Sequence, residues 1–374
     1  MISVMHVIDT GGPGGAETVF AQVATGLDPR RFRSTPIVPS RAWLAATLEA
    51  RGAIPVIAPA QGSFNLAYLL KLRSLAQRTQ TDVIIAHLYG SAVYASLLGR
   101  LGSIPVIAVL HGQTDIAVAD RFAVWKAAIV RRGSREVVFV SDELRRELAP
   151  RLGLRANRCT VIPNGVDTDR FFPAPDRSLR TELAMPDDAM LIGAIGNVRT
   201  PKAYDVLLRA ARLLVDRIPR VHLVIAGDAD NALGRELGAL RDALGLRSQV
   251  TFLGLRADIA QILRNLDVFV LSSRTEGFSI ACVEAMACGI PVVATRSGGP
   301  EEILRDDAGL LVPTGDPGAL AAAIERLIES PDLAQRLAST ALARVCAHYS
   351  LATMLDRYER LVTSLADESG GPHR

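Results

Sequence analysis

The chain has 374 residues, of which 49% are hydrophobic and 22% charged, so it is long enough for two domains that each bury a core. Aromatic residues make up only 5%, which argues against a stacking surface for nucleic acid, and no nucleic-acid partner is expected. The four cysteines form no C-x-x-C pair, and no apolar run is long enough to span a membrane, so a reduced cytoplasmic protein without an export signal is expected.

The charge is unevenly distributed. Residues 1–165 contain 19 Lys and Arg against 11 Asp and Glu, whereas the remaining residues contain 23 against 28. Most of the basic excess lies between Arg121 and Arg158, where Trp125 stands among the cations. This composition is typical of an amphipathic helix at a membrane surface. We therefore expect the first half of the chain to contact an anionic lipid surface, at the inner face of the cytoplasmic membrane.

Apolar strands alternate with helices through the first half of the chain. Ile2 to Ile8 predicts an opening strand, and Gly11 to Gly15 predicts a tight turn into a helix whose amides either face a phosphate or only make the turn. Further strands are predicted at Thr35–Val38, Ala53–Ala58, Asp82–Ala86, Pro105–Leu110 and Val137–Val140. The alternation predicts a parallel sheet with helices on both faces, and ligands of such sheets lie beyond the carboxyl ends of the strands.

The segment from Pro163 to Asp167 and the prolines that follow it predict a linker. Met190 to Ile195 then begins a second unit of the same kind, with strands at Val221–Ala226, Val250–Leu253 and Val268–Ser272. Two similar α/β halves joined by a linker imply a cleft between them.

Two glutamates flank the helix predicted at Ser279 to Ala287. Glu276 follows a buried strand, and Glu284 lies about one and a half turns beyond Ser279. The helix amino terminus suits a phosphate, whereas the carboxylates suit sugar hydroxyls. We therefore assign Glu284 to a ribose diol and Glu276 to a hydroxyl of a second sugar, with Gly277 allowing close approach of the backbone. The alternative is a capped surface helix with two solvated acids.

Cations for a diphosphate are expected in the loop from Gly193 to Lys202. Lys202 is one of three lysines in a chain with 39 arginines, which indicates that a compact ammonium is required there. Arg199 can direct two N–H groups at phosphate oxygens. The alternative is a pair of solvated surface cations.

The motif Glu276-Gly277-Phe278-Ser279, followed by Glu284 with seven residues between the two glutamates, resembles the signature of the retaining glycosyltransferases of family four, also called glycosyltransferase group 1. Residues 163–167, residues 11–17 and the segment around Lys202 are similar to other landmarks of that family, in the same order. The resemblance covers nearly the whole chain. It implies an α/β fold of the GT-B type, in which two Rossmann-like, doubly wound parallel-sheet domains face a central cleft.

The resemblance also implies a division of the chain. Residues 1–165 would form the N-terminal, acceptor-side domain, and residues 166–348 the C-terminal, nucleotide-sugar-binding domain. Residues 349–374 would form a helix that crosses back to the N-terminal domain.

The family's functional residues map onto matching positions of this sequence. The resemblance implies catalytic roles for His111, Arg199, Lys202 and Glu276, and it places His87 on the acceptor side. The residues expected to bind the donor are Gly14, Gly15, Arg256, Gly277, Phe278, Ser279, Ile280 and Glu284. The chain departs from a common form of the pattern at Asn197, where relatives often have arginine, so Arg199 is expected to do that work.

The expected reaction is transfer of a hexosyl unit, with retention, from a UDP- or GDP-sugar to a glycan acceptor. The basic first half favours a lipid-linked acceptor and a role in cell-surface or exopolysaccharide biosynthesis. No cofactor and no metal are expected, because cations of the chain would stabilise the leaving diphosphate. The alternatives are a GT-B nucleotide-sugar epimerase or hydrolase, and a two-lobed binding protein without catalytic activity.

Overall fold

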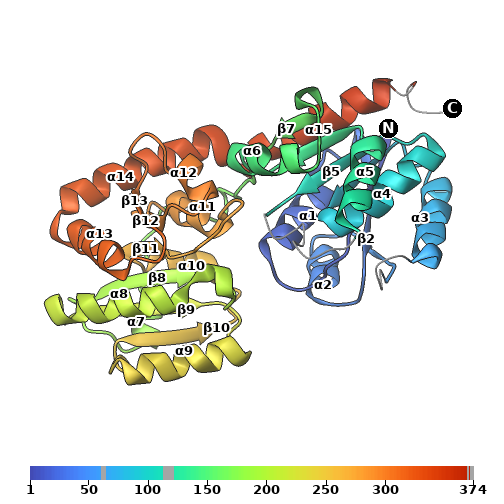
Figure 1. The fold of residues 1–374 in the computed structure, drawn as a ribbon. Coiled ribbons are helices and arrows are strands. Elements are labelled where there is room, and N and C mark those ends of the chain that lie inside the picture. Colours follow the sequence, from blue (N-terminus) through green and yellow to red (C-terminus); the bar gives the residue numbers. More distant parts are fainter. Residues whose placement is uncertain (60–64, 113–121, 369, 371–374) are drawn as a thin grey trace. The chain divides into compact units, whose positions relative to one another are not determined.

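The structure is a computed structural model that describes residues 1–59, 65–112, 122–368 and 370. The chain divides into two compact units: unit 1 contains Met1–Gly165 and Leu351–Arg374, and unit 2 contains Val166–Ser350. Figure 1 shows a sheet in each unit with helices packed against its faces.

The sheet of unit 1 has seven parallel strands in the order β3-β2-β1-β4-β5-β6-β7. The strands are β1 (Ile2–Ile8), β2 (Phe32–Val38), β3 (Val56–Ile57), β4 (Val83–His87), β5 (Val106–Leu110), β6 (Glu136–Phe139) and β7 (Cys159–Val161). The helices are α1 (Gly15–Gly26), α2 (Trp43–Ala50), α3 (Leu66–Arg78), α4 (Tyr89–Gly102), α5 (Ala123–Gly133), α6 (Asp142–Arg151), the 3₁₀ turn η2 (Ala156–Arg158) and α15 (Leu351–Glu368).

Continuous apolar runs explain these strands. Every residue of β4 and β5 is buried, as expected for central strands of a parallel sheet that is covered on both faces. The strand expected at Ala53–Ala58 is shorter, and β3 is confined to two residues. Pro55 precedes β3 and has no N–H to donate to a neighbouring strand.

The sheet of unit 2 has six parallel strands in the order β10-β9-β8-β11-β12-β13. They are β8 (Met190–Ile195), β9 (Val221–Ala226), β10 (Val250–Gly254), β11 (Val268–Leu271), β12 (Val292–Thr295) and β13 (Leu310–Val312). The helical elements are α7 (Ser178–Glu182), η3 (Thr200–Lys202), α8 (Tyr204–Arg217), α9 (Ala232–Ala243), α10 (Ile259–Arg264), α11 (Ile280–Ala287), α12 (Gly299–Ile303), α13 (Pro317–Glu329), α14 (Pro331–Arg344) and the π-helical turn η4 (Val345–Tyr349).

The helix α15 is the last element of the chain but belongs to unit 1. Its Glu359 carboxylate accepts the backbone N–H of Asp28 at 2.8 Å and pairs with Arg31 at 3.1 Å. The Leu355 side chain packs so closely over Gly26 of α1 that a Cβ there would lie 2.7 Å from a leucine methyl. None of the helices in the described part of the chain is long and apolar enough to cross a membrane.

Both sheets reverse strand order once, between β1 and β4 in unit 1 and between β8 and β11 in unit 2. The predicted fold class, two doubly wound parallel-sheet domains, is thereby confirmed. Because ligands of such sheets bind beyond the carboxyl ends of the strands at the reversal, these two edges are where functional side chains are expected.

Candidate active site

The reversal point of unit 2 brings together a lysine and a glutamate that are far apart in sequence. The loop after β8 carries Lys202, and the loop after β11 carries Glu276. Lys202 Nζ lies 2.7 Å from Glu276 Oε1, and only 23% and 11% of the two side chains are exposed. A partly buried pair of this kind combines a positive and a negative group at the edge where a ligand would bind.

The turn after β12 holds the backbone of Glu276 on both sides. The Glu276 N–H donates to the Ser297 carbonyl at 2.7 Å, and the Glu276 carbonyl accepts the Gly299 N–H at 2.9 Å. Gly298 has a φ of +111°, and a Cβ there would lie 2.8 Å from the Glu276 carbonyl oxygen. Glycine is therefore required at position 298 for this close approach.

The helix α11 begins beside Glu276 at a capped amino terminus. Ser279 is the N-cap, and its Oγ accepts the Cys282 N–H at 3.4 Å, while Ile280 is the first helical residue. Phe278 is buried against the ring of Tyr349, with a centroid distance of 5.7 Å. The motif from Gly277 to Ile280 thus serves partly to anchor the amino terminus of α11. This anchoring fixes the direction of the other backbone N–H groups in the first turn.

Glu284 lies in the second turn of α11 and is half-buried. Burial raises the pKa of its carboxyl to about 7, and the positive charge of Arg170 opposes this more weakly. No other described residue gives its carboxylate a hydrogen bond or ion pair. A carboxylate so placed gains by accepting hydrogen bonds from a bound hydroxyl group.

The loop between β8 and η3 carries both Asn197 and Arg199. Asn197 Oδ1 accepts the backbone N–H of Asp228 at 3.0 Å and so ties this loop to the one that follows β9. Arg199 is exposed and has no hydrogen bond from its guanidinium to the described residues, so its side chain is available to a ligand.

Arg256 follows β10 and is held by two carboxylates. Its guanidinium bonds Glu182 of α7 at 2.7 Å and Asp258 at 2.6 Å. Asp258 and then Glu182 hold the pKa of Arg256 above its usual range. The Arg256 side chain is thus engaged within unit 2 and is not grouped with Lys202 and Glu276.

The corresponding edge of unit 1 brings His87 and His111 together. His87 ends β4 and His111 follows β5, and these neighbouring strands place His87 Nδ1 and His111 Nε2 3.0 Å apart. The rings are stacked, and the ring of Phe20 contacts His87 edge-on at 5.3 Å. Burial lowers the pKa of His111 to about 3 and that of His87 well below its usual value, so both are neutral near pH 7. Neutral imidazole donates or accepts hydrogen bonds but adds no positive charge.

Gly14 and Gly15 form the amino terminus of α1 at the same edge. Gly14 is the N-cap residue, and a Cβ there would lie 2.3 Å from a carboxylate oxygen of Glu17. The acid in the first turn of α1 therefore lies over the helix end, where the partial positive charge of the helix favours it.

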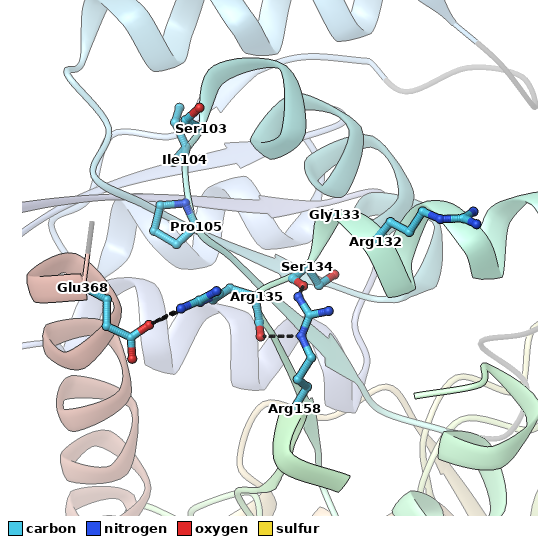
Figure 2. A pocket seen from close by; sticks show the side chains of 9 residues that line it. All are labelled: Ser103, Ile104, Pro105, Arg132, Gly133, Ser134, Arg135, Arg158 and Glu368. Atoms are coloured by element: carbon cyan, nitrogen blue, oxygen red, sulfur yellow. Dashed lines mark hydrogen bonds and ion pairs between the residues drawn. The ribbon is translucent and has the colours of Figure 1, made fainter. Parts of the chain in front are cut away.

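A separate pocket of about 350 Å³ in unit 1 is lined by Glu368, at the end of α15, and by residues that precede β5, β6 and β7, so it lies at the opposite edge of the sheet. Arg135 pairs there with Glu368 at 2.6 Å, and the Arg158 guanidinium donates to three backbone carbonyls. Figure 2 shows the Arg132 side chain pointing away from Arg135 and Arg158. Most of this positive charge is satisfied internally.

Two serines, Ser272 and Ser273, contact the Lys202–Glu276 pair and were missed by sequence reasoning. The available signal was their place directly after β11, at the reversal point of the sheet. Within the described residues, no group of three or more His, Cys, Asp or Glu side chains is arranged to hold a metal ion.

Two family models match the chain. The model described as Glycosyltransferase Family 4 matches residues 13–170, and the model described as Glycosyl transferases group 1 matches residues 176–344. The chain is 29% identical to the D-inositol 3-phosphate glycosyltransferase of Mycobacterium tuberculosis, in an alignment of length 349 that covers 89% of this chain and 71% of the relative.

Solved structures agree with this assignment. The Anabaena protein HepE in complex with UDP-glucose is 25% identical, with a TM-score of 0.86, and the match covers 97% of this chain and 100% of HepE. A glycosyltransferase from Rickettsia africae shares the fold, with 21% identity, a TM-score of 0.84, and coverage of 97% and 98% of the two chains. The chain therefore belongs to the family 4, or group 1, glycosyltransferases, the retaining enzymes of the GT-B fold.

Proposed function

We propose that this enzyme transfers a hexosyl unit, with retention, from a nucleoside diphosphate sugar to a glycan acceptor on a lipid carrier, in the synthesis of a cell-surface polysaccharide or exopolysaccharide. The observation that carries the donor half of the proposal is the Lys202–Glu276 pair at the reversal point of unit 2, beside the capped end of α11. This edge combines a cation, free helix amides and two carboxylates, as a diphosphate between two sugars requires.

The roles follow from the chemistry of the groups. Lys202 and Arg199 would stabilise the negative charge that develops on the leaving diphosphate, together with the amides of α11. Glu276 would accept a hydrogen bond from the transferred sugar and Glu284 from the ribose diol. When the diphosphate binds, Lys202 would shift part of its interaction from Glu276 to the phosphate oxygens.

Retention is best explained by displacement on one face of the sugar, with the leaving phosphate assisting removal of the acceptor proton. Glu276 Oε1 already accepts hydrogen bonds from Lys202 and Ser273, which lowers its reactivity as a nucleophile. His111, neutral at this edge of unit 1, would offer a hydrogen bond to the transferred sugar. Mass spectrometry of the intact enzyme with a slow donor tests this proposal, since a glycosyl adduct on Glu276 would contradict it.

A panel of UDP-, GDP- and ADP-sugars tests the proposed donor. A ligand that binds the folded chain but not the unfolded chain raises the free energy of unfolding by about 2.7 kcal/mol at a concentration a hundredfold above Kd. UDP-glucose is the first candidate, because HepE has been solved with it. We expect at least one sugar nucleotide to raise the Tm of the wild-type chain and to be consumed only when an acceptor extract is added. Consumption without an acceptor would indicate an epimerase or hydrolase.

The lipid-linked acceptor is proposed from the exposed side chains around α5. Phe122, Val124 and Trp125 are 42%, 82% and 73% exposed, and the last turn of α5 carries Arg131 and Arg132. A cluster of exposed apolar side chains beside cations favours binding to the surface of an anionic membrane.

Vesicle sedimentation tests this contact. We expect the wild-type chain to bind vesicles containing phosphatidylglycerol and to be released by salt, and Trp125→Ala to bind them more weakly. Equal binding to neutral phosphatidylcholine vesicles would contradict a role for the cations.

A further inference from the structure

Two adjacent serines at the end of β11 contact opposite members of the Lys202–Glu276 pair. Ser273 Oγ donates to Glu276 Oε1 at 2.6 Å, and Ser272 Oγ donates to the backbone carbonyl of Lys202 at 2.8 Å. The serines are 0% and 1% exposed, so neither hydroxyl exchanges its partner for bulk water. Each charged residue is therefore fixed relative to β11 by a buried hydrogen bond.

The two oxygens of the Glu276 carboxylate are not equivalent. Oε1 accepts hydrogen bonds from both Ser273 and Lys202, whereas no described residue donates to Oε2. A carboxylate with one oxygen fixed in this way presents the other in a single orientation. Such an oxygen is ready to accept a hydrogen bond from a ligand hydroxyl without first losing rotamer freedom.

The serines are themselves held by neighbouring elements. Thr295 Oγ1, at the end of β12, donates to the Ser273 carbonyl at 2.5 Å. The N–H of Arg274 donates to the carbonyl of Pro201 in η3 at 2.7 Å. The segment that carries both hydroxyls is thus tied to β12 on one side and to the lysine-bearing turn on the other.

We propose that Ser273 is a positioning residue for the Glu276 carboxylate, and that Ser272 positions Lys202 through the backbone carbonyl of that residue. The hydroxyls place the Glu276 carboxylate and the backbone of Lys202 before the donor arrives, so that binding energy is not consumed in ordering them. This inference rests on the proposed function, because it assigns the two serines to the donor site of that reaction.

A double-mutant cycle tests the role of Ser273. kcat/KM is measured with UDP-glucose, or with the donor that the panel identifies, for the wild type, Ser273→Ala, Glu276→Gln and the double variant. We expect Ser273→Ala alone to lower kcat/KM about tenfold or more, because the variant loses a hydrogen bond to a charged group. The Kd of this variant for UDP, which lacks the transferred sugar, should differ from that of the wild type by less than about twofold. In the Glu276→Gln background, Ser273→Ala should lower kcat/KM by less than about twofold, because Ser273 acts through Glu276.

If the losses in kcat/KM from the two single variants add in the double variant, the proposed role of Ser273 is overturned. A loss of UDP affinity in Ser273→Ala as large as its loss in kcat/KM would overturn it as well. The same cycle with Ser272→Ala and Lys202→Ala tests the second serine. Ser96→Ala is the matched control, since Ser96 is also 0% exposed and its hydroxyl bonds one partner, Ser134, at 2.8 Å in unit 1. We expect it to leave kcat/KM unchanged.

Two further results separate the possible failures. If Ser273→Ala does not fold, Ser273→Cys keeps a side chain of similar size with a weaker donor, and kcat/KM should then fall less than in Glu276→Gln. A wild-type chain that turns over no donor in the panel would overturn the proposed function itself. A wild-type chain that turns over a donor while the cycle is additive would overturn only the role of the serines.

Discussion

At the residue scale, Lys202 is a partly buried cation at the reversal point of unit 2. Its Nζ lies 2.7 Å from Glu276, and its Cε lies 3.0 Å from where a Cβ on Gly196 would be. The stem of the side chain therefore passes close to the backbone of Gly196. Arginine would present a planar fork in place of a compact ammonium, so we expect Lys202→Arg not to restore the activity that Lys202→Ala removes.

We predict that Lys202→Ala lowers kcat by about 10²–10³ but weakens donor binding much less, because the charge on the diphosphate grows as the glycosidic bond breaks. Steady-state kinetics and titration calorimetry measure the two effects separately. Lys71→Ala is the control, since Lys71 lies in unit 1 and, of the residues that the structure describes, its ammonium donates to the Ile57 carbonyl alone. Equal losses in kcat and in affinity would mean that Lys202 contributes ground-state binding alone.

Glu284 gives the chain a pH dependence of stability. Burial raises the pKa of its carboxyl from 4.5 to about 7, so between these values the folded chain retains a proton that the unfolded chain has released. The free energy of unfolding should therefore fall as pH rises from 4.5 to 7. Glu284→Gln should remove this component and be more stable than the wild type by about 1–3 kcal/mol above pH 7.

Urea unfolding of both chains between about pH 4.5 and pH 8 measures the difference directly. Because both proteins share every other titrating group, subtraction isolates Glu284. A stability difference that does not change with pH would show that the carboxyl is ionised as readily in the folded chain as in the unfolded one.

At the scale of elements, the packing of α4 against α5 depends on the glycine at the end of α5. A Cβ on Gly133 would lie 2.2 Å from the backbone carbonyl oxygen of Ser96, a distance that requires the helices to move apart. Gly102 ends α4 in the same way, but a Cβ there would meet only the Ile104 side chain at 3.5 Å.

We predict that Gly133→Ala lowers the free energy of unfolding by about 1–3 kcal/mol through overpacking. Gly102→Ala should leave it unchanged or raise it by up to about 1 kcal/mol, because alanine loses less backbone entropy. Denaturant unfolding compares the two variants, and similar effects would show that α4 and α5 can separate without cost.

At the scale of the whole molecule, unit 1 is assembled from two distant segments of the chain, whereas unit 2 is continuous. The link is α15, whose Tyr358 side chain is among the largest fully buried groups and is 1% exposed. The Tyr358 hydroxyl is buried and has no hydrogen-bond partner among the described residues, so the ring contributes through packing.

We predict that Tyr358→Ala destabilises unit 1 by about 3–5 kcal/mol, whereas Tyr358→Phe is neutral or slightly stabilising. Both tryptophans, Trp43 and Trp125, lie in unit 1, so tryptophan fluorescence follows the unfolding of that unit. Circular dichroism follows both units. Movement of both transitions by the same amount in Tyr358→Ala would show that the units unfold together.

The strands were predicted well where burial makes the sequence continuously apolar. Ile2–Ile8, Met190–Ile195 and Val221–Ala226 are strands over the predicted residues, because strands covered on both faces admit few polar side chains. The helix expected at Ser279–Ala287 differs only in that Ser279 is its cap. β3 was overestimated because an apolar run interrupted by Pro55 looks like a strand before its neighbours are known.

The candidate site was predictable only in part. The spacing of Glu276 and Glu284 indicated two carboxylates at one helix end, and one lysine in an arginine-rich chain indicated a special position. That Glu182 engages Arg256, and that Asn197 ties two loops together, depends on segments far apart in the sequence. Local patterns carry no information on such contacts.

The sequence by itself determined that this chain is a two-unit α/β protein of the family 4 glycosyltransferases, because buried parallel strands and a helix-end motif are local patterns. The tertiary structure alone decided that Lys202 reaches Glu276, that Ser273 bonds the Glu276 carboxylate and Ser272 the backbone of Lys202, and that burial raises the pKa of the Glu284 carboxyl to about 7. The physical reason is that hydrogen bonds and desolvation act between atoms that the sheet brings together at the ends of β8, β11 and β12, whatever their separation along the chain.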